Sequence, residues 1–173
     1  HAQVSVSEYI NMIALKTAVL LAASLKMGAM IAKVNPADAD HLYAFGKAIG
    51  IAFQLQDDLL DVYGDPEKFG KQVGGDIISN KKTYLLIKAL ELAQGADAIE
   101  LNKWILAKDF DAAAKVKAVT ALYSLLGVDV LLKKEMESYC QQAFSALDQV
   151  RTAKAIEKAG LRGFCVELMG REY

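Results

Sequence analysis

Three aspartates stand close together in an otherwise apolar stretch of the chain: Asp57, Asp58 and Asp61. If this stretch is helical, these side chains and that of Gln54 fall within an arc of about 100°. Aspartate is a poor helix former, and like charges this close repel by about 1 kcal/mol per pair in water. A stripe of carboxylates suits Mg²⁺, which keeps water ligands and shares its coordination with phosphate. The spacing therefore predicts a diphosphate held through Mg²⁺.

Basic residues that could bind the same anion lie on both sides of this stripe. Lys16, followed by Thr17, lies in a mostly apolar stretch, where a lysine is costly unless it is paired. Lys71 lies in a glycine-rich loop, and Lys81 lies in the residues that open a predicted helix. Glycines permit close approach to the backbone, and a helix N-terminus favours anions. From the residues alone, a solvated acidic face and a snorkelling or ion-paired Lys16 remain as alternatives.

The elements that position these residues are predicted to be all-α. Only two of the 173 residues are proline, and we find no convincing strand alternation. Ser5 and Glu8 form a possible capping box for a first helix that continues to about residue 33. Asn35 is the expected N-cap of a second helix that continues to about residue 63. After a loop over 64–79, shorter helices are predicted over 80–94, 97–107, 110–126, 128–150 and 153–169.

The two long helices are predicted to be buried, because each is apolar around most of its circumference. Gly46 and Gly50 lie four residues apart and would let another helix approach closely. Among the shorter helices, two glycines are expected to end helices and two aspartates to cap them: Gly95, Gly127, Asp97 and Asp109.

Length and composition predict a single domain over residues 1–173. Hydrophobic residues make up 54% of the chain and the net charge is −1, which argues against disorder and against general nucleic-acid binding. Two cysteines do not make a disulfide scaffold, and they fit a reducing compartment. We find no signal-peptide pattern and no uninterrupted run of 18 apolar residues, so we expect a cytoplasmic protein without membrane insertion.

Taken together, these motifs resemble the region of the second aspartate-rich motif in trans-isoprenyl (polyprenyl) diphosphate synthases. The resemblance runs the whole length of the chain. The matching residues are Lys16-Thr17, Phe53-Gln54-x-x-Asp57-Asp58-x-x-Asp61, Gly64-Asp65-Pro66, Gly70-Lys71, Gly75-Asp76-Ile77, Asn80-Lys81 and Arg171-Glu172.

The resemblance implies a helical bundle of the isoprenoid synthase type and a Mg²⁺-dependent short-chain prenyltransferase. Such an enzyme joins isopentenyl diphosphate to an allylic diphosphate by ionisation, condensation and loss of a proton. Asp57 would bind Mg²⁺, with Asp58 and Asp61 supporting it directly or through water. The allylic diphosphate would be contacted by Lys16, Lys71 and Lys81. Thr17 and Gln54 would lie along the allylic chain.

One departure from the family is large. Its members carry a first aspartate-rich motif, and the basic residues for isopentenyl diphosphate, ahead of the Lys-Thr pair, and this chain has no second acidic cluster of that kind. The chain resembles the C-terminal half of a synthase that would be a homodimer at full length. These 173 residues alone are predicted to be inactive, to expose an apolar face and to associate or rearrange.

Two alternatives to a prenyltransferase remain, one also an enzyme and the other from a different class. One is an all-α Mg²⁺-dependent nucleotide pyrophosphohydrolase, which would use glutamate pairs on two helices and a pocket for a base. The other is a non-catalytic helical binding or scaffold module. Mg²⁺-dependent thermal stabilisation by inorganic diphosphate would separate the scaffold from the prenyltransferase.

Overall fold

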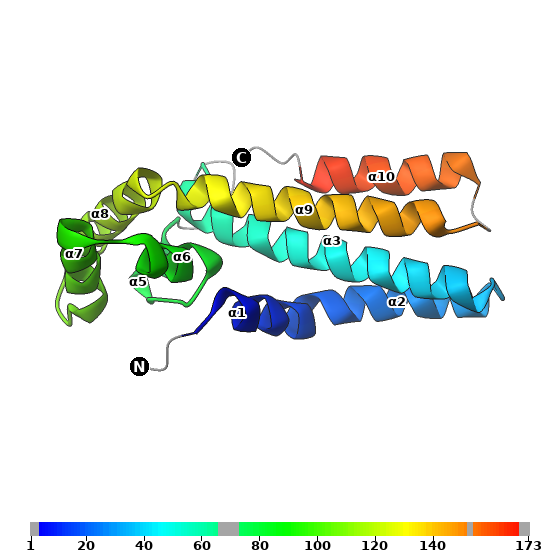
Figure 1. The fold of residues 1–173 in the computed structure, drawn as a ribbon, viewed down its shortest axis with the longest axis horizontal. Coiled ribbons are helices and arrows are strands. Elements are labelled where there is room, and N and C mark those ends of the chain that lie inside the picture. The colour runs from blue at the N-terminus through cyan, green and yellow to red at the C-terminus, as the bar shows by residue number, and fades with distance from the viewer. Residues whose placement is uncertain (1–3, 66–72, 152–153, 170–173) are drawn as a thin grey trace. The chain divides into compact units, whose positions relative to one another are not determined.

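The computed structural model describes residues 4–65, 73–151 and 154–169, and all regular structure in these residues is helical, as predicted. Figure 1 labels the elements along the chain apart from the π-helix η1. They are α1 (Val6–Ile13), the π-helix η1 (Ala14–Ala18), α2 (Val19–Ile31), α3 (Pro36–Tyr63), α5 (Gly75–Ile78), α6 (Tyr84–Leu92), α7 (Gly95–Leu106), α8 (Ala112–Leu125), α9 (Val128–Gln149) and α10 (Ala155–Met169).

The chain divides into two compact units. The first contains Asp57–Lys133 and the residues up to Tyr9, and the second contains Ile10–Gln56 and the residues from Lys134 to Glu172. The division passes through α3 and through α9. A single domain over residues 1–173 stays a prediction.

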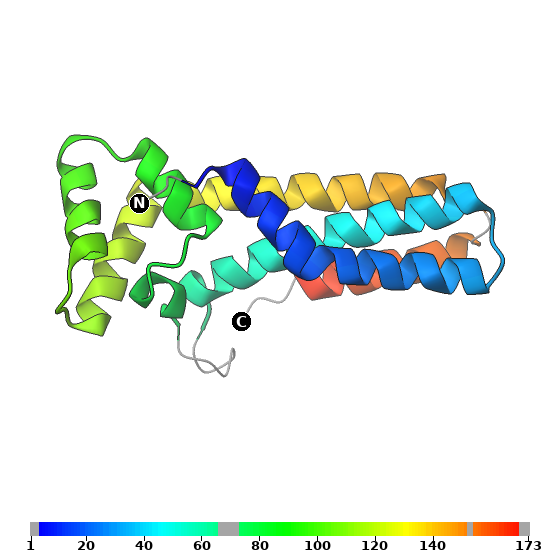
Figure 2. The same ribbon diagram turned by 90° about the horizontal axis from the view of Figure 1, so that it is seen from below.

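In the second unit, α2, α10 and the adjoining lengths of α3 and α9 run side by side (Figures 1 and 2). Their core contains Phe45, Ile49, Leu147 and Cys165. A Cβ atom added at Gly50 would lie 2.6 Å from the Cα atom of Ala18. One added at Gly46 would lie 2.9 Å from the Cα atom of Ala22. The close helix approach predicted at these two glycines is therefore confirmed.

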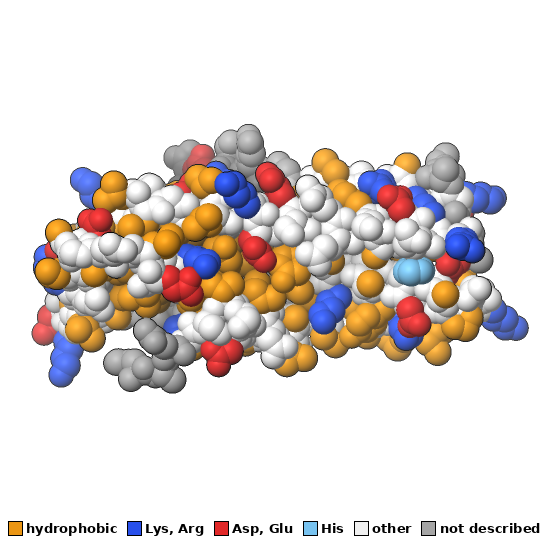
Figure 3. Space-filling view, in the orientation of Figure 1, with side chains coloured by type: hydrophobic (Ala, Val, Ile, Leu, Met, Phe, Trp, Pro, Cys, Tyr) orange, Lys and Arg blue, Asp and Glu red, His pale blue; other side chains and the backbone are white. Residues whose placement is uncertain are grey.

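The helix α2 is less buried than the sequence suggested. Leu20 is 74% exposed and Ile31 is 82% exposed, and hydrophobic side chains lie along the lower edge of Figure 3, where α2 runs. The prediction that this helix is buried is wrong, because within the unit α2 buries small residues such as Ala22 and Ala29 and leaves its larger side chains outside. The prediction of an exposed apolar face is confirmed.

The first helix is also relevant to membranes. By length and composition, the continuous helix Val6–Ile31 could cross a bilayer, although core helices of soluble proteins meet the same criterion. The absence of membrane insertion therefore stays a prediction.

The predicted starts of the two long helices are confirmed. The Ser5 backbone N–H donates to Glu8 Oε2 at 2.8 Å, and the Glu8 N–H donates to Ser5 Oγ at 3.3 Å, which completes the capping box. At the second start, the Ala37 N–H donates to Asn35 Oδ1 at 2.9 Å. These local hydrogen bonds satisfy backbone donors that have no partner within the helix.

Some of the predicted helix ends differ from the structure. Gly95, with φ of 53°, begins α7 instead of ending α6. Asp97 lies in the first turn of α7, but the cap position is Gln94. Asp111, not Asp109, caps α8 by accepting the Ala114 N–H at 2.7 Å. Gly127, with φ of 66°, follows α8 as predicted. The errors arise because several polar residues near each boundary can serve as the cap, and sequence does not rank them.

In the first unit, α5, α6 and α7 all pack against α8. The approach of α5 is close, because a Cβ atom added at Gly74 would lie 2.6 Å from a Val116 methyl group. Gly74 also has φ of 90°, a conformation that favours glycine. The predicted loop over 64–79 therefore contains the short helix α5, held between the end of α3 and α8.

Candidate functional site

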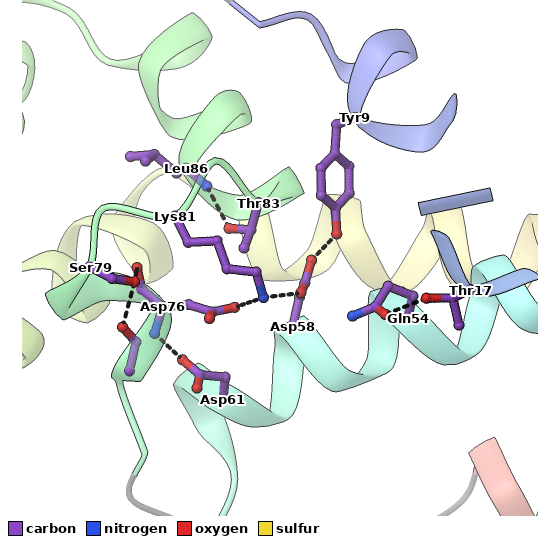
Figure 4. A network of polar contacts seen from close by, with 11 residues as sticks. Tyr9, Thr17, Gln54, Asp58, Asp61, Asp76, Ser79, Lys81, Thr83 and Leu86 are labelled. Carbon is purple, nitrogen blue, oxygen red and sulfur yellow. Dashed lines mark hydrogen bonds and ion pairs between the residues drawn. The ribbon is translucent and has the colours of Figure 1, made fainter. Parts of the chain in front are cut away.

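The end of α3 carries a buried carboxylate with two partners from distant parts of the chain. Asp58 is 1% exposed, and its Oδ2 atom accepts the hydroxyl hydrogen of Tyr9. Its Oδ1 atom lies 3.4 Å from Nζ of Lys81. Lys81 Nζ lies 2.7 Å from Oδ2 of Asp76 (Figure 4). A tyrosine, a lysine and two aspartates therefore form one connected network within the first unit.

Asp61 accepts hydrogen bonds from the backbone at the start of α5. Its Oδ2 atom accepts the backbone N–H of Asp76 at 2.9 Å, and its backbone carbonyl accepts the Gly74 N–H at 2.5 Å. Free backbone N–H groups at the start of a helix favour a carboxylate. Asp61 thus fixes the start of α5 beside the end of α3, and this places the Asp76 side chain within reach of Lys81.

Burial changes the protonation of these groups. Desolvation raises the pKa of Asp58 to about 6, although the Tyr9 hydrogen bond and the charge of Lys81 oppose this rise. Burial also raises the pKa of Asp61, against the hydrogen bond from the Asp76 backbone. The pKa of Tyr9 is raised by burial and by the charge of Asp58, so the hydroxyl stays protonated and donates a hydrogen bond to Asp58.

The pKa of Lys81 responds to opposing effects. Burial alone would lower it, but the hydrogen bond to Asp76 and the charge of Asp58 raise the pKa above its ordinary value. Lys81 therefore carries a positive charge at neutral pH, and its side chain is 40% exposed. It is the positive group that compensates the crowded acids of α3.

The predicted metal ligands are only partly available to a cation. Protein donors already occupy Oδ2 of Asp58 and Oδ2 of Asp61, and the described residues contain no group of three or more Asp, Glu, His or Cys side chains that could hold a metal. Mg²⁺ often uses only one or two carboxylates, with water and phosphate completing its shell. The half-buried Asp57 and the remaining oxygen of Asp61 fit that kind of site. The hydrogen bonds of Asp58 and Asp61 do not fit a preformed site in which all three carboxylates bind the metal directly.

The predicted Lys-Thr pair lies in the second unit, in the π-helix η1. The Thr17 hydroxyl donates to Oε1 of Gln54 at 3.1 Å (Figure 4). Single turns of π-helix frequently occur at functional sites, because they displace one residue from the regular helix face. Lys16 is exposed, so its charge carries no burial cost. The structure thus joins Thr17 to Gln54, and the ligand contacts predicted for these three residues stay predictions.

Lys71 and the terminal pair Arg171-Glu172 lie outside the described residues. Two members of the network carried no predicted role, Tyr9 and Asp76. Tyr9 is separated from Asp58 by 49 positions, and in sequence it looks like any aromatic residue of an apolar helix. Asp76 stood within a matching motif, but nothing in its spacing indicated a bond to Lys81.

A cavity of about 830 Å³ lies elsewhere in the first unit. It is lined mainly by apolar side chains of α8, of α5 and its neighbouring residues, and of the end of α3, including Val116 and Ala121, Ile78, and Val62. None of the predicted site residues that the structure describes lines it, so cavity size does not identify the site.

Comparison with known proteins identifies the family. The family model described as polyprenyl synthetase matches residues 1–123. A geranylgeranyl diphosphate synthase of Sulfolobus acidocaldarius is 35% identical over 162 residues, which cover 90% of this chain and 46% of that protein.

Two solved structures show the same fold. A crystal structure of a geranylgeranyl pyrophosphate synthase matches with a TM-score of 0.91 and 39% identity, over 100% of this chain and 54% of that one. A geranylgeranyl pyrophosphate synthase of Corynebacterium glutamicum, complexed with isoprenyl diphosphate and magnesium, matches with a TM-score of 0.86 and 30% identity, over 96% and 47%. The chain spans about half the length of each of these relatives. With the helical bundle and the ordered aspartate, lysine and glycine motifs, these matches show that the chain belongs to the polyprenyl synthetase family.

Proposed function

We propose that this chain is the diphosphate-binding part of a Mg²⁺-dependent short-chain trans-prenyltransferase, of the geranylgeranyl or farnesyl type. The whole enzyme would join isopentenyl diphosphate to an allylic diphosphate by ionisation, condensation and loss of a proton. The observation that carries the proposal is the network at the end of α3, where Lys81 lies between Asp58 and Asp76. The names of the relatives support the substrate class.

In this proposal Lys81 binds the diphosphate of the allylic substrate. Its ammonium group has three N–H donors, of which Asp58 and Asp76 engage two. The partly exposed side chain can direct the third to a phosphate oxygen. Because the two aspartates hold the ammonium in place, little conformational entropy is lost when the anion binds.

Asp57 and Asp61 would hold Mg²⁺, which would neutralise the charge that develops on the departing diphosphate. Asp58, with both oxygens engaged, orients Lys81 and at most supports the cation through water. The positioning role of Asp58 follows from its two partners, Tyr9 and Lys81. It narrows the role first expected for Asp58.

Thr17 and Gln54 would line the allylic chain, with the Thr17 hydroxyl orienting the side-chain amide of Gln54. Their oxygens would stabilise the positive charge left on the substrate after the diphosphate departs. Lys16 and Lys71 would supply further contacts to the diphosphate. Apolar helices around the reacting carbon would exclude water, which would otherwise quench that charge.

The complete protein would act as a homodimer in the cytoplasm, while the 173 residues alone would not turn over substrate. The exposed apolar side chains of α2 support association, because they form a surface that contact with a second chain would bury. A pyrophosphohydrolase is not favoured, since the buried acids of this site are aspartates paired with a lysine. A non-catalytic module is the outcome if the following experiment fails.

The test is thermal unfolding of the 173-residue chain with inorganic diphosphate, with and without Mg²⁺. We expect stabilisation only when both are present, by about 2.7 kcal/mol when diphosphate is at a hundred times its dissociation constant. Lys81→Met should reduce the effect sharply but leave the weaker binding through Mg²⁺, and Lys117→Met, which changes an exposed lysine of α8, should keep the full effect. Equal melting temperatures in all conditions would leave a scaffold as the better explanation.

A further inference from the structure

A buried lysine in the first unit has no role in the proposed chemistry. Lys115 of α8 is 1% exposed. Its Nζ atom donates to Oδ1 of Asn80 at 2.8 Å and to the carbonyl oxygen of Ile78 at 3.3 Å, and it lies 4.2 Å from the centre of the Phe110 ring. These partners, recorded within the described part of the chain, are all neutral.

An ammonium group without a carboxylate partner is expensive to bury. Burial accordingly lowers the pKa of Lys115. An apolar side chain of similar length would fill the same space without this cost, so packing alone does not explain a lysine here. What a lysine adds is several N–H donors that can hold more than one acceptor at once.

The acceptors that Lys115 holds immediately precede Lys81. Ile78 is the last residue of α5, and Asn80 has φ of 51°, in the left-handed region that few non-glycine residues adopt. The Asn80 side chain is held on its other side too, since its Nδ2 atom donates to the carbonyl oxygen of Ile105 at 3.1 Å. The strained turn is therefore fixed from both α7 and α8.

The residue after Asn80 is Lys81, the lysine of the network with Asp58 and Asp76. The Lys81 backbone N–H donates to the Asp76 carbonyl oxygen at 2.9 Å, and its side chain reaches Asp76 and Asp58. The direction in which the chain leaves Asn80 thus sets where the Lys81 ammonium can lie. A change in the Asn80 turn would move Lys81 relative to both aspartates.

We propose that Lys115 is a positioning residue, which holds the left-handed turn at Asn80 and thereby places Lys81 for diphosphate binding. The second half of this statement rests on the proposed function, while the first half does not. Lys115 itself does not contact the ligand. Its effect on binding should pass entirely through Lys81.

Calorimetric titration of the 173-residue chain with Mg²⁺ and inorganic diphosphate tests the effect on binding. We expect Lys115→Met to weaken binding by about tenfold, in the range of couplings between residues that share partners. The control Lys117→Met lies two positions along the same helix at an exposed site and should change binding less than about twofold. In the double variant with Lys81→Met, Lys115→Met should add no further loss. Independent, additive losses would overturn the proposal.

Amide hydrogen exchange tests the turn without any ligand. In Lys115→Met, the N–H groups of Asn80 and Lys81 should exchange about tenfold faster relative to that of Val119 in the core of α8. A merely structural loss of stability would accelerate all three alike, and that result would contradict the proposal. If Lys115→Met does not fold, Asn80→Gly takes its place, because glycine accepts the left-handed backbone but offers no side-chain acceptor.

The two measurements separate the two proposals. If the unaltered chain binds no Mg²⁺–diphosphate, the proposed function fails, and the exchange ratio alone decides whether Lys115 holds the turn. If the chain binds but Lys115→Met leaves both binding and the exchange ratio unchanged, the positioning role is refuted and the proposed function stands.

Discussion

The helix α3 has two contrasting regions. In its middle, Gly46 and Gly50 present almost no side chain, and the backbone of the first long helix packs directly against them. At its end, Asp58 and Asp61 present charged side chains whose partners are a tyrosine, a lysine and a backbone N–H group. One helix therefore combines a contact built from small residues with a site built from polar ones.

The difference predicts which region serves stability and which serves the proposed ligand binding. Close packing gains dispersion and buries apolar area without desolvating charge. Buried carboxylates cost free energy, and even well-paired ones often gain less than apolar residues would. We expect substitutions in the middle of α3 to affect folding, and substitutions at its end to affect function and pH dependence more than folding.

Asp57→Ala in the complete protein is the strongest test at the polar end. We expect turnover to fall by about a thousandfold, because under the proposed function the substitution removes a carboxylate that would hold Mg²⁺, and with it several kcal/mol of charge stabilisation. The melting temperature should change little, since the substitution also removes repulsion from Asp58. Steady-state kinetics and thermal unfolding measure the two effects. A large drop in melting temperature with retained activity would contradict the assignment.

Asp58→Asn tests the cost of the buried carboxylate. In the folded chain its pKa rises from the ordinary 3.8 to about 6, so its stabilising contribution is complete below pH 4 and is lost as the pH rises through 6. This rise corresponds to about 3 kcal/mol. The variant should therefore gain stability relative to the unaltered chain by up to that amount between pH 4 and pH 7.

Urea unfolding at the two pH values measures this gain. The exposed Asp109→Asn serves as the control and should show no comparable change. The free energy of unfolding of Asp58→Asn could differ from that of the unaltered chain by the same amount at both pH values. That result would show that burial of Asp58 does not govern the pH dependence.

Gly50→Ala tests the packed middle of α3. The added Cβ would lie 2.6 Å from the Ala18 backbone, and overpacking of this kind costs about 1–3 kcal/mol, even though alanine is the better helix former. Gly28→Ala in α2 is the matched control, because a Cβ there meets nothing within 4 Å, and it should stabilise by about 0.5–1 kcal/mol. Denaturant unfolding of both variants should give changes of opposite sign. Equal gains would mean that the helices do not approach closely.

Tyr9→Phe is the smallest expected change. It leaves one oxygen of the buried Asp58 without its hydroxyl donor, at a cost of about 1–2 kcal/mol in the free energy of unfolding at neutral pH. The cost should shrink as the pH falls through about 6, where Asp58 becomes neutral in the folded chain. Tyr123→Phe removes a hydroxyl from another buried tyrosine of the same unit and should lack this pH dependence. Identical pH profiles would argue against the Tyr9–Asp58 bond.

Local sequence signals predicted most of the helices. The capping box of Ser5 and Glu8 and the cap at Asn35 are confirmed, because each depends on residues within three positions of one another. The resemblance in order and spacing of the aspartate, glycine and lysine motifs also indicated the family. The cap of α8 was predicted at Asp109 but lies at Asp111, since neighbouring residues compete for the same backbone donors.

Sequence alone thus determined the helical class, the carboxylate stripe and the glycines that permit close packing, because these depend on residue type and on the period of the helix. Only the tertiary structure decided which acid is buried, which one holds α5, and that Tyr9 and Lys115 have polar partners. It also decided that the large side chains of α2 lie outside. These outcomes depend on contacts between residues far apart in the chain, and no local pattern records which polar group will meet which.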